Sequence, residues 1–161
     1  MAHRVYIGAG SNLGDRQTNL AQARDLLGPD LCLLQMSPIY ETAPWGFLEQ
    51  GSFLNQVFEA QTDLEPQGLL LTLKHIERSL GRTISFQYGP RLIDLDILFF
   101  DRLVIHTSDL EIPHPRISER AFELVPLADL IPHFIHPVLQ RSICDLLSKV
   151  DQSSVKPYEP Q

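Results

Sequence analysis

Apolar and polar residues alternate along the 161-residue chain with two different periods. A period of two is typical of strands, whereas apolar residues three or four positions apart are typical of helices. Asp15 can cap one expected helix, and Pro66 suits the first turn of another. The pattern predicts strands at residues 4–8, 31–40, 53–60 and 91–100, and helices at residues 15–27, 66–80, 118–125 and 139–150.

The order of the first six elements, β-α-β-β-α-β, predicts a ferredoxin-like α+β sandwich in a single domain spanning residues 1–161. In such a sandwich, two helices cover one face of an antiparallel sheet. The two C-terminal helices are additions to this unit. We expect residues 151–161 to be a flexible tail, disordered in its proline-rich part from residue 155. The loop at residues 41–52 has exposed aromatic residues and is a candidate ligand lid.

The net charge of −7 argues against general nucleic-acid binding, because phosphate backbones are held by clustered basic residues. The sequence has no apolar stretch of membrane-spanning length and no secretory signal pattern, so we expect a cytoplasmic protein. With no heptad pattern, a monomer is the default expectation. Cys32 and Cys144 are expected to be reduced, buried and structural.

Two carboxylates, Asp94 and Asp96, interrupt an apolar run that should form a buried strand, where charge is normally excluded. Residues two apart on a strand point to the same face, so the two side chains should lie side by side. Like charges held this close require a cation, and divalent metal is the natural candidate. Arg91, next to Pro90, supplies a positive fork suited to phosphate. The alternative is a strand end whose acidic residues face water.

Nucleotide-binding glycine motifs do not account for this chain. The turn at residues 8–14 follows a strand, but the dinucleotide fingerprint requires glycine where Leu13 stands. No Gly-x4-Gly-Lys-Ser/Thr run follows Gly8 or Gly81. Any nucleotide must therefore be held by arginines and metal.

Several single residues have two possible roles. His114 lies between two prolines with Arg120 nearby, which suits donation to a phosphate or a simple surface turn. Phe53 and Phe122 fit a core, or an aromatic pair that stacks on a flat heterocycle. In the second case, the amide of Asn55 could bind the edge of that heterocycle.

Six segments carry a resemblance that covers about residues 4 to 150. They are, in order, Gly10-Ser11-Asn12-Leu13-Gly14, Tyr40-x-Thr42-x-Pro44, Phe53-Leu54-Asn55, Gly81-Arg82, Gly89-Pro90-Arg91-x-x-Asp94-x-Asp96-Ile97-Leu98 and Pro113-His114. With these, the chain resembles the 6-hydroxymethyl-7,8-dihydropterin pyrophosphokinase family of folate biosynthesis. The resemblance implies transfer of pyrophosphate from ATP to the hydroxymethyl group of the pterin.

The resemblance also implies roles for individual residues. Asp94 and Asp96 match the aspartates that hold two magnesium ions, and Asp96 is also the candidate base. The expected ATP-binding residues are Glu77, Arg82, Arg91, His114 and Arg120, of which Arg82 and Arg91 are also expected to be catalytic. The expected pterin-binding residues are Thr42, Ala43, Trp45, Phe53, Asn55 and Phe122.

The loop before the acidic pair departs from the family pattern at Ile84, Gln87 and Tyr88, where it has fewer charges with which to close over ATP. Three hypotheses follow. The chain is an active pyrophosphokinase, a silent pterin or nucleotide binder, or a ferredoxin-like interaction module. Release of AMP from ATP in the presence of the pterin separates the first from the others.

Overall fold

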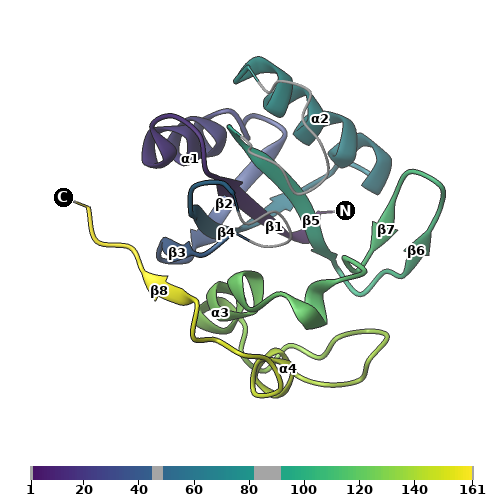
Figure 1. Cartoon of the computed structure of the whole chain (residues 1–161). Coiled ribbons are helices and arrows are strands. Elements are labelled where there is room, and N and C mark those ends of the chain that lie inside the picture. The colour runs from purple at the N-terminus through teal and green to yellow at the C-terminus, as the bar shows by residue number, and fades with distance from the viewer. Residues whose placement is uncertain (1, 45–48, 82–91, 161) are drawn as a thin grey trace.

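The computed structural model describes residues 2–44, 49–81 and 92–160, and its central feature is a twisted antiparallel sheet (Figure 1). The strands are β1 (His3–Ser11), β2 (Leu31–Met36), β3 (Tyr40–Thr42), β4 (Phe53–Thr62), β5 (Asp94–Phe100), β6 (Ile105–His106), β7 (Glu111–Ile112) and β8 (Val155–Pro157). The helices are α1 (Arg16–Asp25), α2 (Pro66–Ser79), α3 (Ala121–Leu130) and α4 (Ile143–Leu147), with a 3-10 turn, η1 (Ile117–Glu119).

The sheet has the strand order β5-β1-β4-β3-β8, and β2 pairs with β4 beside β3. All of these pairings are antiparallel. A separate hairpin, β6-β7, lies beyond the end of β5 (Figure 1). The order β1-α1-β2-β4-α2-β5 confirms the predicted ferredoxin-like α+β fold.

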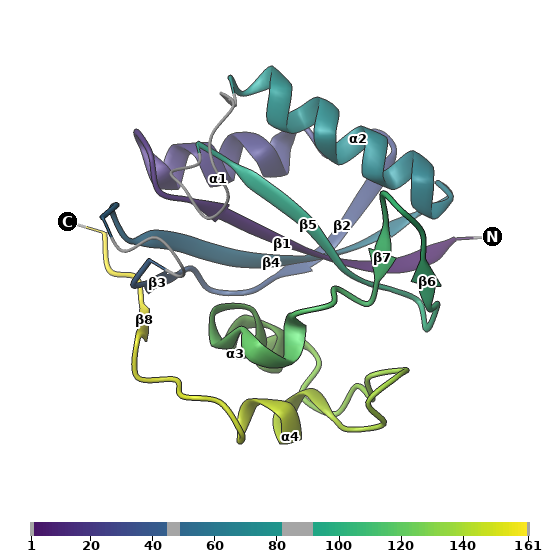
Figure 2. The same cartoon turned by 45° about the vertical axis from the view of Figure 1, so that its right-hand side comes forward.

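Helices cover both faces of the sheet (Figure 2). On one face, α1 and α2 bury a core with Leu20, Leu73 and Phe58 at its centre. On the other, α3 and α4 bury a second core around Tyr6 and Phe99. The result is three layers, because the C-terminal helices cover the face that a minimal ferredoxin-like unit leaves exposed.

The capping residues act as the sequence indicates. The Oδ1 atom of Asp15 accepts a hydrogen bond of 3.1 Å from the backbone amide of Thr18 at the start of α1. Pro66 is the first residue of α2, where its missing amide hydrogen costs nothing. Gly81, just after α2, has a φ of +82°, which favours glycine.

The expected strand at 31–40 is wrong, because the structure divides it into β2 and β3. The Oγ atom of Ser37 accepts a 3.0 Å hydrogen bond from the amide of Val57 and so replaces a backbone carbonyl in the ladder. Pro38 follows and has no amide hydrogen to donate. The predicted C-terminal helices also shift: that at 118–125 becomes η1 followed by α3, and that at 139–150 shortens to α4.

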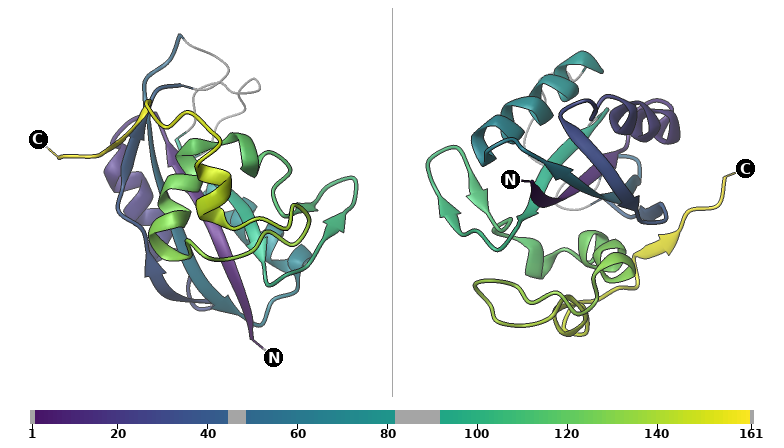
Figure 3. Two further views of the ribbon diagram at one scale, coloured as in Figure 1. Left: turned by 90° about the horizontal axis from the view of Figure 1, so that it is seen from below. Right: turned by 180° about the vertical axis from the view of Figure 1, so that it is seen from behind.

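The expected disordered tail is also wrong for Val155–Pro157, which forms β8 and pairs with β3. Tyr158 extends this attachment, since its amide donates a 3.0 Å hydrogen bond to the carbonyl oxygen of Ile39. Figure 3 shows the chain running from α4 to the edge of the sheet. Composition alone misses this strand, because a proline at the outer edge of a sheet needs no ladder partner for its nitrogen.

Cys32 and Cys144 are free thiols, but both are exposed, so the expectation that they are buried is wrong. Each lies on the outward side of its element, away from the two cores. In the described part of the chain, every helix is too short or too polar to cross a membrane.

Candidate active site

Two glycines on the central strand β1 form the floor of the candidate site. In the register of the sheet, Gly8 lies opposite Asp96 and Gly10 lies opposite Asp94 on one side. On the other side, Gly10 lies opposite Asn55 of β4. Directly opposed residues project to the same face of a sheet. The acidic pair and Asn55 are therefore separated by a strip of backbone without side chains.

The β4 side of this floor holds residues expected to bind the pterin. The hydroxyl group of Thr42, on β3, donates a 2.8 Å hydrogen bond to Oδ1 of Asn55, and both side chains are buried. The Nδ2 atom of Asn55 then lies over β1, 3.1 Å from where a Cβ atom at Gly10 would be. Phe53 lies on the same face, with its ring 3.6 Å from that position. The structure therefore brings Thr42, Phe53 and Asn55 together.

The ends of the loop between β3 and β4 are tied to the start of α1 by residues that the sequence analysis did not select. Nη1 of Arg16 donates to Oε2 of Glu41 at 2.7 Å and to the carbonyl oxygen of Ser52 at 3.0 Å. Nδ2 of Asn12 donates to the carbonyl oxygen of Gly51 at 3.1 Å. Asn12 belongs to the first family segment, so this segment anchors the loop beside the floor.

On the β5 side, Asp94 and Asp96 are half-buried and face the same way, as predicted. Partial burial raises the pKa of Asp96 to about 7, and the negative charge of Asp94 acts in the same direction. Arg120 and Lys74 oppose this rise. Lys74 was not predicted as a site residue. The rise follows from burying a carboxyl group next to other acidic side chains.

Glu77 is buried under β5, and its negative charge adds to the rise in the pKa of Asp96. Its Oε2 atom accepts a 2.8 Å hydrogen bond from the backbone amide of Leu95, the residue between the two aspartates. Because β5 is at the edge of the sheet, this contact satisfies an amide that has no neighbouring strand. Glu77 thus fixes the backbone that carries Asp94 and Asp96.

His114 lies beside the same strand. Its backbone amide donates a 3.1 Å hydrogen bond to the carbonyl oxygen of Leu98, two residues beyond Asp96. Its Nδ1 atom accepts from the amide of Arg116 at 3.1 Å, which leaves the proton on Nε2. Burial lowers the pKa of His114 to about 4, and the charges of Arg120 and Arg116 add to this effect. His114 is therefore a neutral hydrogen-bond donor at physiological pH.

Arg120 comes to the acidic pair from the start of α3. Its Nη1 atom lies 3.8 Å from Oδ2 of Asp96 and 3.6 Å from Oε1 of Glu123. The guanidinium carbon is 5.5 Å from the ring centroid of Phe122, a cation–π distance. Glu123 is a site residue that the sequence analysis missed. Burial raises the pKa of Glu123, and the positive charge of Arg120 beside it opposes this rise.

The donor set fits magnesium better than zinc. Within the described ranges, no group of three or more His, Cys, Asp and Glu side chains could enclose a metal ion. Asp94 and Asp96 supply carboxylate oxygens alone. Magnesium is typically held by one or two carboxylates, with substrate phosphates and water completing its shell. The pair therefore suits magnesium that arrives with a polyphosphate.

Three expected site residues, Trp45, Arg82 and Arg91, lie outside the described residues. Ala43 is exposed just beyond β3, next to Thr42. Phe122 is half-buried in the first turn of α3.

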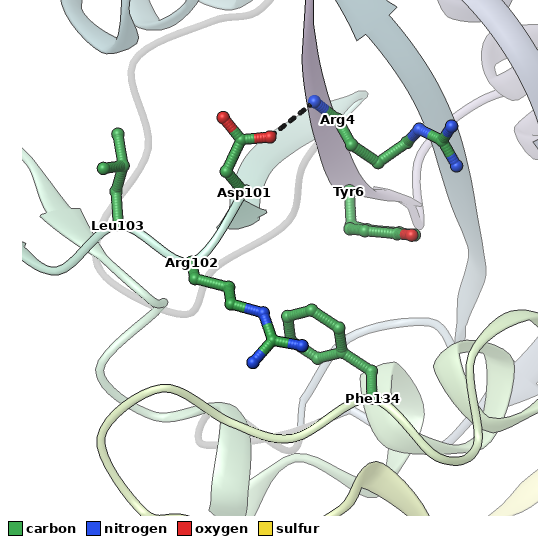
Figure 4. Close-up of a pocket in the computed structure, with 6 residues that line it drawn as sticks. All are labelled: Arg4, Tyr6, Asp101, Arg102, Leu103 and Phe134. Carbon is green, nitrogen blue, oxygen red and sulfur yellow. Dashed lines mark hydrogen bonds between the residues drawn. The ribbon is translucent and has the colours of Figure 1, made fainter.

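A second hollow lies on the same face of the sheet but at the opposite ends of β1 and β5 (Figure 4). It is open to solvent, and its volume is about 580 Å³. Nη1 of Arg4 contacts Oε1 of Glu59 at 3.0 Å, and the backbone amide of Arg4 donates to Asp101. The guanidinium carbon of Arg102 lies 6.0 Å from the ring centroid of Phe134. None of the expected site residues lines it. The lining residues are Arg4, Tyr6, Asp101, Arg102, Leu103 and Phe134.

An acidic pair on a strand, with an arginine and a neutral histidine beside it, fits the class of enzymes that transfer phosphoryl groups from ATP with the help of a divalent metal. The sequence profile described as "7,8-dihydro-6-hydroxymethylpterin-pyrophosphokinase (HPPK)" matches residues 6–132. The chain belongs to this family. The enzyme accordingly transfers pyrophosphate from ATP to 6-hydroxymethyl-7,8-dihydropterin in folate biosynthesis.

Curated relatives agree with this assignment. The chain is 40% identical over 154 residues to the 2-amino-4-hydroxy-6-hydroxymethyldihydropteridine pyrophosphokinase of Aquifex aeolicus, covering 96% of this chain and 94% of the relative. The Bacillus subtilis enzyme of the same name is 47% identical over 132 residues, covering 81% and 79%. A folic acid synthesis protein of Dictyostelium discoideum is 45% identical, but this chain spans only 20% of its length.

Solved structures support the fold. The HPPK-DHPS protein of Plasmodium falciparum superposes with a TM-score of 0.78 at 18% identity, covering 92% of this chain and 45% of that one. At this identity, the likeness concerns the fold alone.

Proposed function

We propose that Asp94 and Asp96 hold two magnesium ions on the phosphates of ATP. The observation that carries this proposal is the position of both carboxylates on one face of β5, beside the glycine floor and with Arg120 3.8 Å from Asp96. Magnesium, when bound, would neutralise charge on the phosphates and polarise the transferred group. Arg82, Arg91, His114 and Arg120 would contact phosphate oxygens, and Glu77 would act through the backbone of β5.

The pterin ring would lie on the β4 side of the floor. Asn55, oriented by its hydrogen bond from Thr42, presents an amide edge to a heterocycle. Phe53 and Phe122 would stack on the faces of the ring. Backbone groups at Thr42, Ala43 and Trp45 would complete the recognition of its edge. In this arrangement, the hydroxymethyl group of the pterin would face β5 and the acidic pair.

In the reaction, the hydroxymethyl oxygen attacks the β-phosphorus of ATP. The bond from that phosphorus to the oxygen bridging the α-phosphate breaks, and AMP leaves. The proton of the hydroxymethyl group passes to the carboxylate of Asp96, which is the base in this proposal. The neutral Nε2–H group of His114 donates to a phosphate oxygen and adds no charge.

The test uses Asp94→Asn and Asp96→Asn, separately and together, with Asp109→Asn as control. Asp109 is an exposed aspartate on the β6-β7 hairpin, bonded to Thr107. AMP release is measured with and without pterin over a magnesium titration, and circular dichroism checks the fold. The double variant should lose turnover by at least about 100-fold, while the control keeps it.

The single variants separate the two roles of Asp96. If Asp94 only holds magnesium, excess magnesium should restore part of the activity of Asp94→Asn. It should not restore Asp96→Asn, which also lacks the base. Substantial turnover in the folded double variant would refute the metal proposal, and equal rescue of both single variants would refute Asp96 as the base.

We further propose that the enzyme acts as a cytoplasmic monomer on its two small-molecule substrates, without a nucleic-acid or membrane partner. Light scattering of the purified chain tests the monomer.

A further inference from the structure

Glu123 is a buried carboxylate beside the acidic pair for which the proposed reaction has no use. Its side chain is 6% exposed. Within the described residues, its Oε2 atom is buried without a hydrogen-bond partner, and Arg120 is its ion-pair partner through Oε1. Burying an ionisable group with one oxygen unsatisfied costs stability. A costly group at a substrate site calls for a functional reason.

The position of Glu123 depends on the floor of the site. A Cβ atom at Gly8 would lie 3.1 Å from Oε1 of Glu123 and 3.3 Å from a methyl carbon of Leu98. Any side chain at Gly8 would therefore crowd this carboxylate. Because Gly8 is paired with Asp96 in the sheet, the carboxylate of Glu123 lies against the backbone beside the acidic pair.

The guanidinium of Arg120 lies between two acidic groups at similar distances. Its Nη1 atom is 3.6 Å from Glu123 and 3.8 Å from Asp96, and its side chain is only 13% exposed. If Asp96 were the sole acid near Arg120, the guanidinium would be drawn onto the carboxylates that must bind the cation. Glu123 attracts it from the side of α3 and offsets that pull. The guanidinium then lies beside the carboxylate of Asp96 and not directly on it.

We propose that Glu123 is a positioning residue, which holds the guanidinium of Arg120 away from the acidic pair and in place to bind a phosphate of ATP. This inference rests on the proposed binding of ATP by Arg120. The proposal gives a physical reason for keeping a carboxylate buried beside Arg120. The ion pair with Arg120 offsets part of the free-energy cost of burying Glu123. The proposal also explains why Gly8 has no side chain.

The test is a double-mutant cycle of Glu123→Gln and Arg120→Met, with steady-state kinetics for both substrates and a thermal melt of each protein. Glu123→Gln keeps the shape of the side chain and removes its charge. We expect it to raise the KM for ATP about fivefold or more, a usual coupling between contacting groups. The kcat and the KM for the pterin should stay within about twofold, and the melting temperature should not fall.

The Arg120→Met background shows whether Glu123 acts through Arg120. In that background, Glu123→Gln should leave the KM for ATP unchanged, because the group it positions is gone. Asp145→Asn is the matched control, since Asp145 also pairs with an arginine at 3.0 Å, but on the surface of α4. It should leave both KM values unchanged.

Each failure has its own signature. If Arg120→Met alone leaves the KM for ATP unchanged, then the proposed role of Arg120 is wrong and the inference falls with it. If Arg120→Met raises that KM but Glu123→Gln does not, only the inference is overturned. A lower melting temperature with unchanged KM values in Glu123→Gln would show a merely structural residue. If Glu123→Gln changes the KM for ATP equally in the wild-type and Arg120→Met backgrounds, Glu123 does not act through Arg120 and the inference is overturned.

Discussion

Replacing His114 with asparagine should remove a pH-dependent part of the stability of this enzyme. The imidazole is held neutral, because burial and the charges of Arg120 and Arg116 lower its pKa from 6.5 to about 4. Its Nδ1 atom accepts the amide of Arg116 at 3.1 Å. In His114→Asn, the Oδ1 atom can accept the same hydrogen bond, so the turn is kept and the titrating group is lost.

The sign of the effect follows from the two pKa values. Between pH 6.5 and about 4, the unfolded chain binds a proton at His114 that the folded chain does not bind. The wild-type protein therefore loses stability as the pH falls through this window, and the loss is complete near pH 4. Each tenfold change in proton affinity is about 1.4 kcal/mol, so the total loss is up to about 3 kcal/mol. In a chain of 161 residues, this is about 6–12 °C in melting temperature.

The assay is urea unfolding of wild type and His114→Asn at pH 7, 6, 5 and 4. The wild-type free energy of unfolding should fall more steeply below pH 6.5, by up to about 1.4 kcal/mol per pH unit relative to the variant. His136, whose pKa burial also lowers, contributes to both proteins and cancels in the difference. His133→Asn, at an exposed position, controls for the loss of an imidazole. Parallel curves for wild type and His114→Asn would refute the reasoning.

Two further predictions concern the floor of the site and its support. Gly10→Ala places a methyl group 3.1 Å from Nδ2 of Asn55, so the KM for the pterin should rise about tenfold. Gly68→Ala on α2 is its control, because a methyl group there would lie 3.6 Å from Leu64, an ordinary contact distance, and should leave that KM unchanged. An equal KM for both variants would contradict the proposed place of the pterin over Gly10. Glu77→Leu leaves the amide of Leu95 without its acceptor and should lower the free energy of unfolding by about 1–3 kcal/mol. Glu77→Gln retains an acceptor oxygen and should lose much less in the same urea titration.

The fold was predictable where local signals and burial agree. Alternating residues at β1, β4 and β5, the cap at Asp15 and the proline at the start of α2 all point to the observed elements. The errors occur where tertiary contacts decide. The side chain of Ser37 replaces a backbone group and breaks one strand into two. Edge pairing with β3 orders Val155–Pro157 despite its composition.

Part of the geometry of the candidate site was predictable from the sequence, and part was not. Spacing by two along a strand places Asp94 and Asp96 on one face without any further information. The sequence shows Glu123 three residues after Arg120, but it cannot show that packing buries this carboxylate against Gly8 of β1. The sequence did contain a signal for the floor. Gly8 and Gly10 are two residues apart on a strand, so they leave one face of that strand without side chains.

The third layer of the fold explains how the two halves of the site are held together. The floor, Asn55 and the acidic pair belong to the sheet, whereas Arg120, Phe122 and Glu123 belong to the start of α3. Helix α3 is fixed to the sheet by the second core, in which the Phe99 ring packs against aromatic and aliphatic neighbours further along the same face. A shift of α3 would move Arg120 relative to the aspartates, where electrostatic effects depend strongly on distance. Packing in the second core thus sets the position of the Arg120 guanidinium relative to Asp96, so the C-terminal helices help to build the proposed site.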